Sequence, residues 1–232
     1  NNNRSVRYRL LFPTAIRGGR NIHEIPFGAV ERPEGIECPA QNWVDYADGA
    51  KGVALLNRGL PGNNVADGTM MLSLMRGVRI EAYGGMDMQT DTGCEIGKEL
   101  TFDYALVPHA GDWRGAGIYR DGHEFNHPLM ALTAGTHLGA LPPRWGFLDV
   151  SHPNIIVSAL KPGEDGGVVL RVYEAAGVKV KGATIKFHMP ILGAWEVNLV
   201  EDAGRRLRIV KGRLQFDMRP FEVKSILWQN QV

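Results

Sequence analysis

Hydrophobic and polar residues alternate in parts of the chain with the two-residue period of a half-buried β-strand. Residues 5–12 place Val6, Tyr8 and Leu10 on one face of such a strand. Residues 102–107 alternate in the same way. The pattern therefore predicts two strands that each turn one face to a core and the other to solvent.

Two apolar runs on either side of a polar loop organise the first half of the chain. The runs cover residues 53–56 and 70–75, and the loop at 57–67 is rich in Asn and Gly. We predict two buried strands joined by this loop, which would be the working surface of the protein. An ordinary solvated loop is the alternative. The amide and guanidinium groups that the loop offers to hydroxyl-rich ligands belong to Asn57, Arg58, Asn63 and Asn64.

Glycine and proline divide the remaining parts of the first half. Residues 24–31 contain Pro and Gly and predict an edge strand or a bulge. Residues 84–97 have little periodicity and predict a long loop. A short helix is expected at 114–123, although Gly115 and Gly117 weaken it. The Leu-Pro-Pro-Arg sequence at 141–144 is the best candidate linker.

After residue 147 the chain becomes regular, with about seven short strands separated by turn signals, the spacing of a β-sandwich. Alternation predicts that Trp195 and Phe216 lie in its core. We therefore expect an all-β protein with two domains, a larger β-sandwich at 1–146 and a small immunoglobulin-like β-sandwich at 147–232. The predicted strands of the second domain cover 154–160, 168–174, 183–189, 194–199, 207–210, 214–218 and 222–228.

Charge and composition narrow the classes of function. The chain has 232 residues and a formal net charge of +1, which argues against binding to nucleic acid through its phosphates. One basic cluster, at 205–213, is interpreted as the solvated face of a hairpin. Two cysteines, Cys38 and Cys94, are too few for a disulfide framework and favour a cytoplasmic protein. We expect no membrane segment and no secretory leader, because the chain lacks a long apolar run.

Six stretches follow one another in order from near the start of the chain to near its end. They read EIPFGAVERP at 24–33, PAQNWVDY at 39–46, GVALLNRG at 52–59, LMR at 74–76, YALVPHAGDW at 104–113 and RPFEVKSI at 219–226. Together these stretches resemble the C-terminal β region of glycoside hydrolase family 38, the zinc-dependent retaining α-mannosidases.

The resemblance implies both a fold and an incomplete enzyme. It implies a truncated galactose-mutarotase-like β-supersandwich followed by the small sandwich. In this family the carboxylate nucleophile and the Asp and His ligands of one zinc ion lie in an N-terminal α/β domain, of which nothing is matched here. We therefore expect no catalytic residue and no metal ligand in this chain, which alone would be inactive. Its partners would be that catalytic domain, on the same polypeptide, and a mannoside substrate.

The resemblance also implies one substrate-binding residue. The strand after the glycine-rich loop carries, in these enzymes, an arginine that faces the catalytic cleft, and Arg76 matches it. A guanidinium there could bind sugar hydroxyls or a carboxylate of the site. The alternative is a salt bridge to an acid such as Glu81. Asn57 and Arg58 are further candidates. Eukaryotic members have two adjacent arginines at this strand end, whereas Gly77 follows here.

No other motif predicts catalysis. His109, Asp112, His123 and His127 could suggest a metal site, but their spacing is not that of a metal-binding helix. We instead expect His109 and Asp112 to hold a turn through bonds to the backbone. No Gly-x-Ser-x-Gly motif is present, and Cys94 has no neighbouring His to activate it.

Three functions therefore compete. The first is the non-catalytic β portion of an α-mannosidase, which supports the catalytic domain and lends residues to the rim of its sugar-binding cleft. The second is a free-standing carbohydrate-binding module, for which Trp43, Trp113 and Trp145 could provide stacking surfaces. The third is a structural interaction domain.

Overall fold

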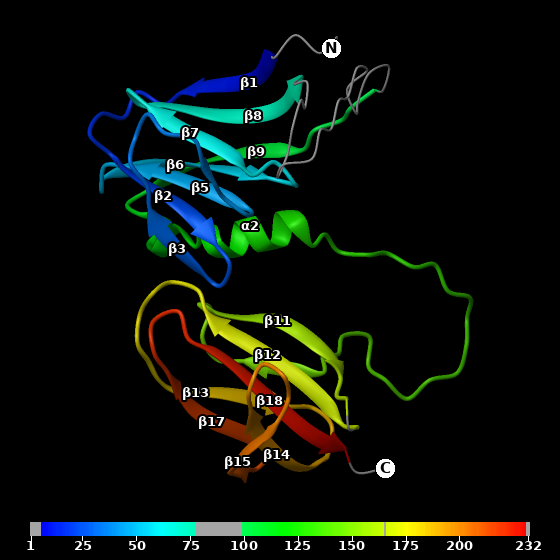
Figure 1. Ribbon diagram of the computed structural model, residues 1–232. Coiled ribbons are helices and arrows are strands. Elements are labelled where there is room, and N and C mark those ends of the chain that lie inside the picture. The colour runs from blue at the N-terminus through cyan, green and yellow to red at the C-terminus, as the bar shows by residue number, and fades with distance from the viewer. Residues whose placement is uncertain (1–5, 78–98, 165, 231–232) are drawn as a thin grey trace, which may run out of the picture. The chain divides into compact units, whose positions relative to one another are not determined.

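The computed structural model describes residues 6–77, 99–164 and 166–230 (Figure 1). The chain divides into two compact units. The first contains residues 1–26 and 30–128, and the second contains residues 27–29 and 129–232. Strands make up 52% of the structure and helices 6%, and every strand pairing is antiparallel, so the predicted all-β class is confirmed. The predicted loop at 84–97 lies outside the described residues.

The first unit contains one four-stranded sheet in the order β1-β8-β7-β4. The two predicted strands in it, near residues 5–12 and 70–75, form as β1 and β8 and pair with each other. The predicted loop at 57–67 is partly wrong, because five of its residues form β7, which makes a hairpin with β8. The strands are β1 (Val6–Pro13), β4 (Cys38–Pro39), β7 (Gly62–Ala66) and β8 (Thr69–Gly77).

A second sheet of this unit has five strands, in the order β3-β2-β5-β6-β9. The predicted edge strand at 24–31 is two strands, since a turn at Pro26 and Phe27 separates them. β9 starts two residues later than its predicted beginning and pairs along the whole of β6. The strands are β2 (Arg20–Ile25), β3 (Gly28–Glu31), β5 (Trp43–Ala47), β6 (Lys51–Asn57) and β9 (Tyr104–Ala110).

The five-stranded sheet is covered on both faces. One face packs on the other sheet through a core that includes Tyr46, Leu55 and Leu72. The opposite face carries Trp43 and Leu56, which stand opposite each other in the register, and is covered by the helices. Figure 1 shows α2 lying against this sheet on the side away from β1 and β8. Burial of both faces explains why residues 53–56 form an uninterrupted apolar run.

Two short helices, α1 (Trp113–Ala116) and α2 (Ile118–Asn126), occupy the region where one helix was predicted. The Asp112 side chain caps α1 by accepting a hydrogen bond from the backbone N–H of Gly115 at 3.0 Å. Gly117 separates the helices with a φ of 76°, a left-handed conformation that glycine adopts without strain. The glycines therefore mark the break between the helices and do not prevent helix formation.

Close contact between α2 and the sheet depends on Gly122. A Cβ atom added at this position would lie 2.5 Å from Cδ1 of Trp43. Trp43 cannot easily move aside, because it is 1% exposed and its ring centroid lies 5.1 Å from that of Trp113. Because glycine has no side chain, α2 can approach β5 this closely at position 122.

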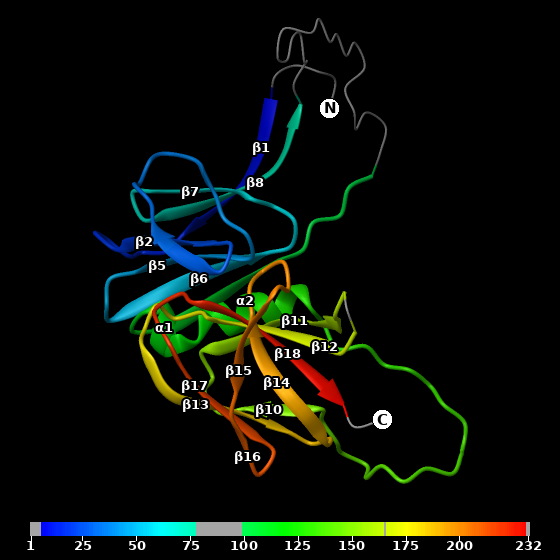
Figure 2. The ribbon, with the colours of Figure 1, turned by 60° about the horizontal axis from the view of Figure 1, so that its bottom comes forward.

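The second unit is a sandwich of two sheets, with orders β10-β13-β17-β16 and β11-β12-β18-β14-β15 (Figure 2). The predicted strands form, except that the expected strand at 207–210 is divided at Arg208 into β15 and β16, which belong to different sheets. The strands are β10 (Leu148–Val150), β11 (Ile155–Pro162), β12 (Val168–Glu174), β13 (Val180–Phe187), β14 (Ile191–Val197), β15 (Ala203–Leu207), β16 (Ile209–Val210), β17 (Arg213–Met218) and β18 (Val223–Asn230).

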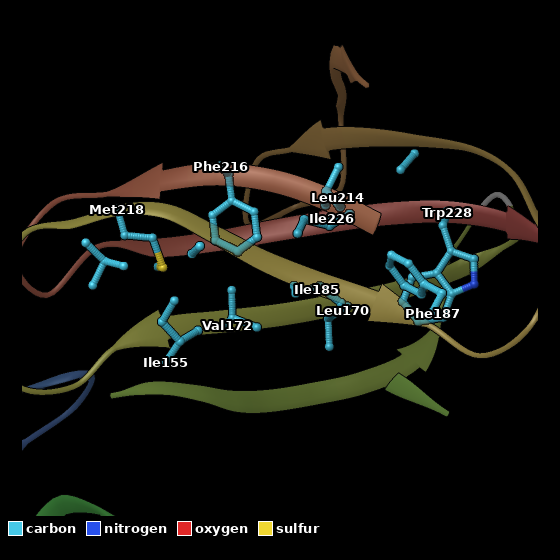
Figure 3. Close-up of a cluster of buried hydrophobic side chains, with 13 residues drawn as sticks. Ile155, Leu170, Val172, Ile185, Phe187, Leu214, Phe216, Met218, Ile226 and Trp228 are labelled. Atoms are coloured by element: carbon cyan, nitrogen blue, oxygen red, sulfur yellow. The ribbon is translucent and has the colours of Figure 1, made fainter. Parts of the chain in front are cut away.

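Side chains from both sheets fill the core of this sandwich (Figure 3). Phe187 and Trp228 meet edge to face with ring centroids 5.0 Å apart. Phe216 lies in the core as predicted. The prediction for Trp195 is wrong, because its neighbour Ala194 lies in the core and side chains alternate along a strand. Trp195 is only partly buried.

A buried carboxylate holds one end of the sandwich together. Glu174 is 0% exposed. It accepts hydrogen bonds from the backbone N–H groups of Ala176 at 2.9 Å, Val178 at 3.0 Å and Phe221 at 3.0 Å. Nδ2 of Asn154 donates a fourth at 2.8 Å. Glu174 therefore joins two turns and the start of β11 through charge-assisted bonds.

Residues 127–147, between α2 and β10, contain no helix or strand. The predicted linker at 141–144 lies in this segment. The two compact units meet in sequence at residues 128 and 129. The domain boundary between residues 146 and 147 stays a prediction.

We predict that Gly122→Ala destabilises the first unit, although alanine favours helices. The added methyl group would overlap Trp43, and overpacking of this kind costs about 1–3 kcal/mol. Gly115→Ala is the matched control, because its Cβ would meet nothing closer than Asp112 Oδ1 at 3.7 Å. Thermal unfolding should show a lower melting temperature for Gly122→Ala and an unchanged or higher one for Gly115→Ala. Equal melting temperatures for the two variants would contradict the close packing of α2.

Candidate functional site

Three of the stretches that the sequence analysis singled out meet at one cavity in the first unit. The cavity has a volume of about 650 Å³ and is lined by residues 24–26, 39–42 and 59–61. We call it the loop pocket. Its lining combines apolar and proline side chains with the carboxyl group of Glu24 and the amides of Gln41 and Asn42.

Backbone hydrogen bonds bring these stretches together. The N–H of Gln41 donates to the carbonyl of Glu24 at 3.1 Å. The N–H of Ala40 donates to the carbonyl of Pro61 at 2.9 Å. The N–H of Asn57 donates to the carbonyl of Asn42 at 2.9 Å. The walls of the pocket are therefore fixed by the backbone.

Glu24 is the ionisable group of the loop pocket. It is 7% exposed. Its Oε2 accepts a hydrogen bond from the backbone N–H of Asn42 at 2.7 Å, and its Oε1 accepts one from Nδ2 of the same residue at 3.3 Å. Burial raises the pKa of Glu24 to about 7, and the bonds from Asn42 only partly oppose this rise. The group can therefore hold or release a proton near neutral pH.

Asn57, a predicted substrate-binding residue, lies inside the protein. Its side chain is 0% exposed, and its Oδ1 accepts a hydrogen bond from the backbone N–H of Leu60 at 3.0 Å. Its carbonyl accepts one from Nδ2 of Asn126 at 2.9 Å. Asn63 and Asn64 are buried as well. In this structure Asn57 shapes the turn that forms one wall of the loop pocket.

Arg58, the second candidate, is partly exposed but already has partners. Its Nη1 lies 2.9 Å from Oδ2 of Asp103. Its Nη2 donates to the carbonyl of Phe125, and its guanidinium carbon lies 4.8 Å from the centre of that ring. These contacts hold Arg58 between β9 and the end of α2.

Arg76, the third candidate, is exposed at the end of β8. It stands opposite Arg7 of β1 in the register, and Arg7 is paired with Glu37 at 2.6 Å. Within the described ranges no acid lies within 4 Å of Arg76. Glu81, its expected alternative partner, lies outside those ranges. The structure brings Asn57 and Arg58 together and places Arg76 on the other sheet.

The sequence analysis did not predict a buried acid–histidine pair. Nε2 of His109 lies 2.7 Å from Oδ1 of Asp45, and the two side chains are 6% and 1% exposed. Burial raises the pKa of Asp45 to about 6. Gly52 provides the space, because a Cβ there would lie 2.3 Å from Cε1 of His109. The available signal was the position of Asp45 between Val44 and Tyr46 in an otherwise apolar strand.

The predicted roles of the other polar residues are partly changed. Asp112 holds a turn as expected. Nδ1 of His109 lies 3.3 Å from the backbone carbonyl oxygen of Ala110, and its Nε2 also pairs with the Asp45 side chain. The rings of His123 and His127 are stacked with centroids 4.3 Å apart. In the described part of the chain, no three or more His, Cys, Asp and Glu side chains are grouped so that they could hold a metal ion. These residues therefore do not fit the zinc site that the family resemblance implies.

Membrane insertion through a helix receives no support. Among the described residues, neither helix has the length or the hydrophobicity to span a bilayer.

Two family models match the chain, and both describe the same family. The model "Glycosyl hydrolases family 38 C-terminal domain" matches residues 2–82. The model "Glycosyl hydrolases family 38 C-terminal beta sandwich domain" matches residues 154–226. The first match includes the loop pocket and Arg76, and the second covers most of the small sandwich.

The proteins described below, which are similar to this chain, are all named alpha-mannosidases. The chain is 31% identical to human alpha-mannosidase 2C1 over 231 residues, which is 93% of the chain and 21% of that protein. It is 28% identical to alpha-mannosidase G of Dictyostelium discoideum, over 90% of the chain and 20% of that protein. The crystal structure of an alpha-mannosidase from Enterococcus faecalis V583 has the same fold, with a TM-score of 0.78 and 23% identity over 97% of the chain and 26% of that structure.

The chain spans about a fifth of the length of the curated relatives it matches. The two family models and the names of the curated relatives agree on the family. The chain belongs to the C-terminal β region of glycosyl hydrolase family 38.

Proposed function

We propose that this chain is the non-catalytic C-terminal β portion of a retaining, zinc-dependent α-mannosidase that hydrolyses terminal α-mannosides. One observation carries the proposal. The chain aligns over 93% of its own length with a protein named alpha-mannosidase but covers only 21% of that protein. The rest of the relative has room for a catalytic domain, which would be the partner of this chain on the same polypeptide.

The chemistry of the reaction supports a division of labour between the two parts. Retaining glycoside hydrolysis needs two carboxyl groups about 5 Å apart on either side of the scissile bond. A zinc site needs three or four ligands about 2 Å from the metal. The described residues contain no suitable group of metal ligands. Zinc, when bound to the catalytic domain, would polarise an oxygen of the reacting sugar or stabilise negative charge near it.

Arg76, Arg58 and Asn57 are proposed to serve the rim of the sugar-binding cleft in different ways. Arg76 is exposed at a strand end, so its guanidinium is available to make two parallel hydrogen bonds to sugar hydroxyls or to a carboxylate. Arg58 is held by Asp103 and would present a fixed positive charge. Asn57 is buried, and it would act by holding the turn at 57–60 in place.

A free-standing carbohydrate-binding module is less well supported. Stacking on a sugar needs an exposed aromatic face. Trp43 and Trp113 are only 1% and 2% exposed and pack against each other. Trp145 is 39% exposed but lies in a segment without regular structure.

A cytoplasmic location is part of the proposal. Cys38 is a free thiol. Thiols of this kind persist in a reducing compartment.

The first prediction from the proposed function concerns zinc binding and turnover by the isolated chain. Because the ligand set is expected on the missing domain, the purified chain should bind no stoichiometric zinc and should not hydrolyse an aryl α-mannoside. Metal analysis and a chromogenic assay measure both quantities. The parent protein is the positive control, and it should show both. Tightly bound zinc together with turnover by the chain alone would refute this division of labour.

The second prediction concerns Arg76→Ala in the parent protein. Hydrogen bonds from a charged donor contribute roughly 1.5–3 kcal/mol, so kcat/KM for an α-mannoside should fall about tenfold to a hundredfold. The melting temperature should change little, because an exposed side chain contributes little to packing. Arg120→Ala, in the exposed i,i+4 pair with Glu124, is the matched control and should retain wild-type kinetics. Wild-type kinetics of Arg76→Ala would remove this residue from the site.

The third prediction uses the titration of Glu24. Its folded-state pKa, about 7, is above the ordinary value of 4.5, so it stabilises the fold below about pH 4.5 and this contribution is lost as pH rises through 7. In Glu24→Gln the loss should be absent, and above pH 7 the variant should be more stable than the wild type by an amount of the order of 2 kcal/mol. Thermal unfolding of both proteins between pH 5 and 8 measures the difference. Parallel pH profiles would show that Glu24 does not titrate in this range.

A further inference from the structure

The outer face of one sheet in the second unit carries an unusual concentration of positive charge. In β13 and β17 the residues Ile185 and Leu214 point into the sandwich core. Their neighbours Lys186 and Arg213 therefore point to the other face, because side chains alternate along a strand. Figure 2 shows β13, β17 and β16 side by side in this sheet.

This face is hollowed by a cavity of about 670 Å³, which we call the basic cavity. Four basic side chains line it, together with the hydroxyl of Thr184 and the amide of Gln215. Its lining contains no carboxylate. The basic side chains are those of Lys186, Arg208, Lys211 and Arg213. Three of them belong to the sequence cluster that was interpreted as a solvated hairpin face, and the fold adds Lys186 from a distant strand.

The arrangement places like charges directly opposite each other. Lys186 and Arg213 are register partners on adjacent strands. Like charges in this position destabilise a sheet unless something neutralises them. Asp149 is the register partner of Lys186 on its other side, but its carboxylate lies 2.7 Å from Nε2 of His188. In the described ranges no ion pair within 4 Å involves any of the four basic residues.

Some other basic residues of the same unit are neutralised by carboxylates. Arg205 and Lys224 both pair with Glu196, at 2.9 Å in each case. Lys161 pairs with Glu201. Carboxylates therefore neutralise these residues, whereas the lining of the basic cavity contains none. A surface that retains repelling charges around a hollow is suited to an anionic ligand.

We propose that the basic cavity binds a small organic phosphate that carries at least two negative charges. The guanidinium groups of Arg208 and Arg213 suit the oxygen atoms of phosphate, which they can bind through two parallel hydrogen bonds. Lys186 and Lys211 add positive charge on flexible side chains that can adjust to the position of the ligand. Thr184 and Gln215 supply neutral polar contacts for the organic part. The volume is typical of a small-molecule site.

A nucleic acid fits these observations less well. Binding to a phosphate backbone uses an extended basic surface, and the whole chain carries a net charge of only +1. The four charges instead surround a single hollow. This inference does not depend on the proposed mannosidase function, because it concerns the other unit and requires no turnover.

Isothermal titration calorimetry of the 232-residue chain with inorganic pyrophosphate and with glucose 6-phosphate tests the proposal. Glucose is the uncharged control ligand. We expect saturable binding of both phosphates that weakens at higher ionic strength, and no binding of glucose. Lys186→Gln and Arg213→Gln should each weaken binding at least tenfold. Both variants should melt at or above the wild-type temperature, because each removes one member of a repelling pair.

Arg205→Gln is the matched control variant. It removes the same charge from the same region, but Arg205 does not line the basic cavity. The affinity of the Arg205→Gln variant for pyrophosphate should stay within about twofold of that of the wild type. The proposal is overturned if the chain shows no saturable binding, or if Arg205→Gln weakens binding as much as Arg213→Gln. It is also overturned if a DNA duplex binds more tightly than pyrophosphate and if Lys186→Gln and Arg213→Gln abolish the binding of that duplex.

Discussion

Burial of both faces of the five-stranded sheet is the constraint from which much of the first unit follows. One face needs apolar side chains to meet the other sheet, and the opposite face needs them to meet α2. Polar groups can remain in such a sheet only with partners of their own. Nε2 of His109 and Oδ1 of Asp45 satisfy this condition through each other. Oδ2 of Asp45 is buried and has no hydrogen-bond partner among the described residues. Glycines at positions 52 and 122 provide the space that the imidazole and the indole ring of Trp43 require.

The same constraint determines what the candidate loop can do. Because β6 is buried along most of its length, Asn57 at its end is buried too, and its side chain is used to organise the following turn. That turn and the backbone of residues 39–42 create the loop pocket around Glu24. Of the three residues predicted to bind substrate, Arg58 and Arg76 are therefore the two that are exposed.

Alternation and turn residues were sufficient to predict the all-β class and nearly every strand of the small sandwich, since these signals are local. They failed where the relevant contact is distant in sequence. Asn57 and Arg58 are adjacent, and only packing against α2 and β9 makes one buried and the other exposed. Trp195 was misplaced because its smaller neighbour Ala194 is the residue that packs in the core, which the local alternation does not indicate. Lys186 joins the three basic residues in and next to the β16–β17 hairpin only through the pairing of β13 with β17.

The order in which strands pair has a consequence for synthesis on the ribosome. β1 pairs with β8, so Val6 cannot pair until Gly77 has been synthesised. In the same way, Lys51 of β6 cannot pair with β9 until Ala110 has been synthesised. Contacts between residues so far apart form slowly, because the intervening chain must first be brought together. Until β9 emerges, the apolar run of β6 has an open edge that could pair with another chain. The first unit is therefore vulnerable to aggregation while it is being made, and a chaperone that shields residues 53–56 would act during that interval.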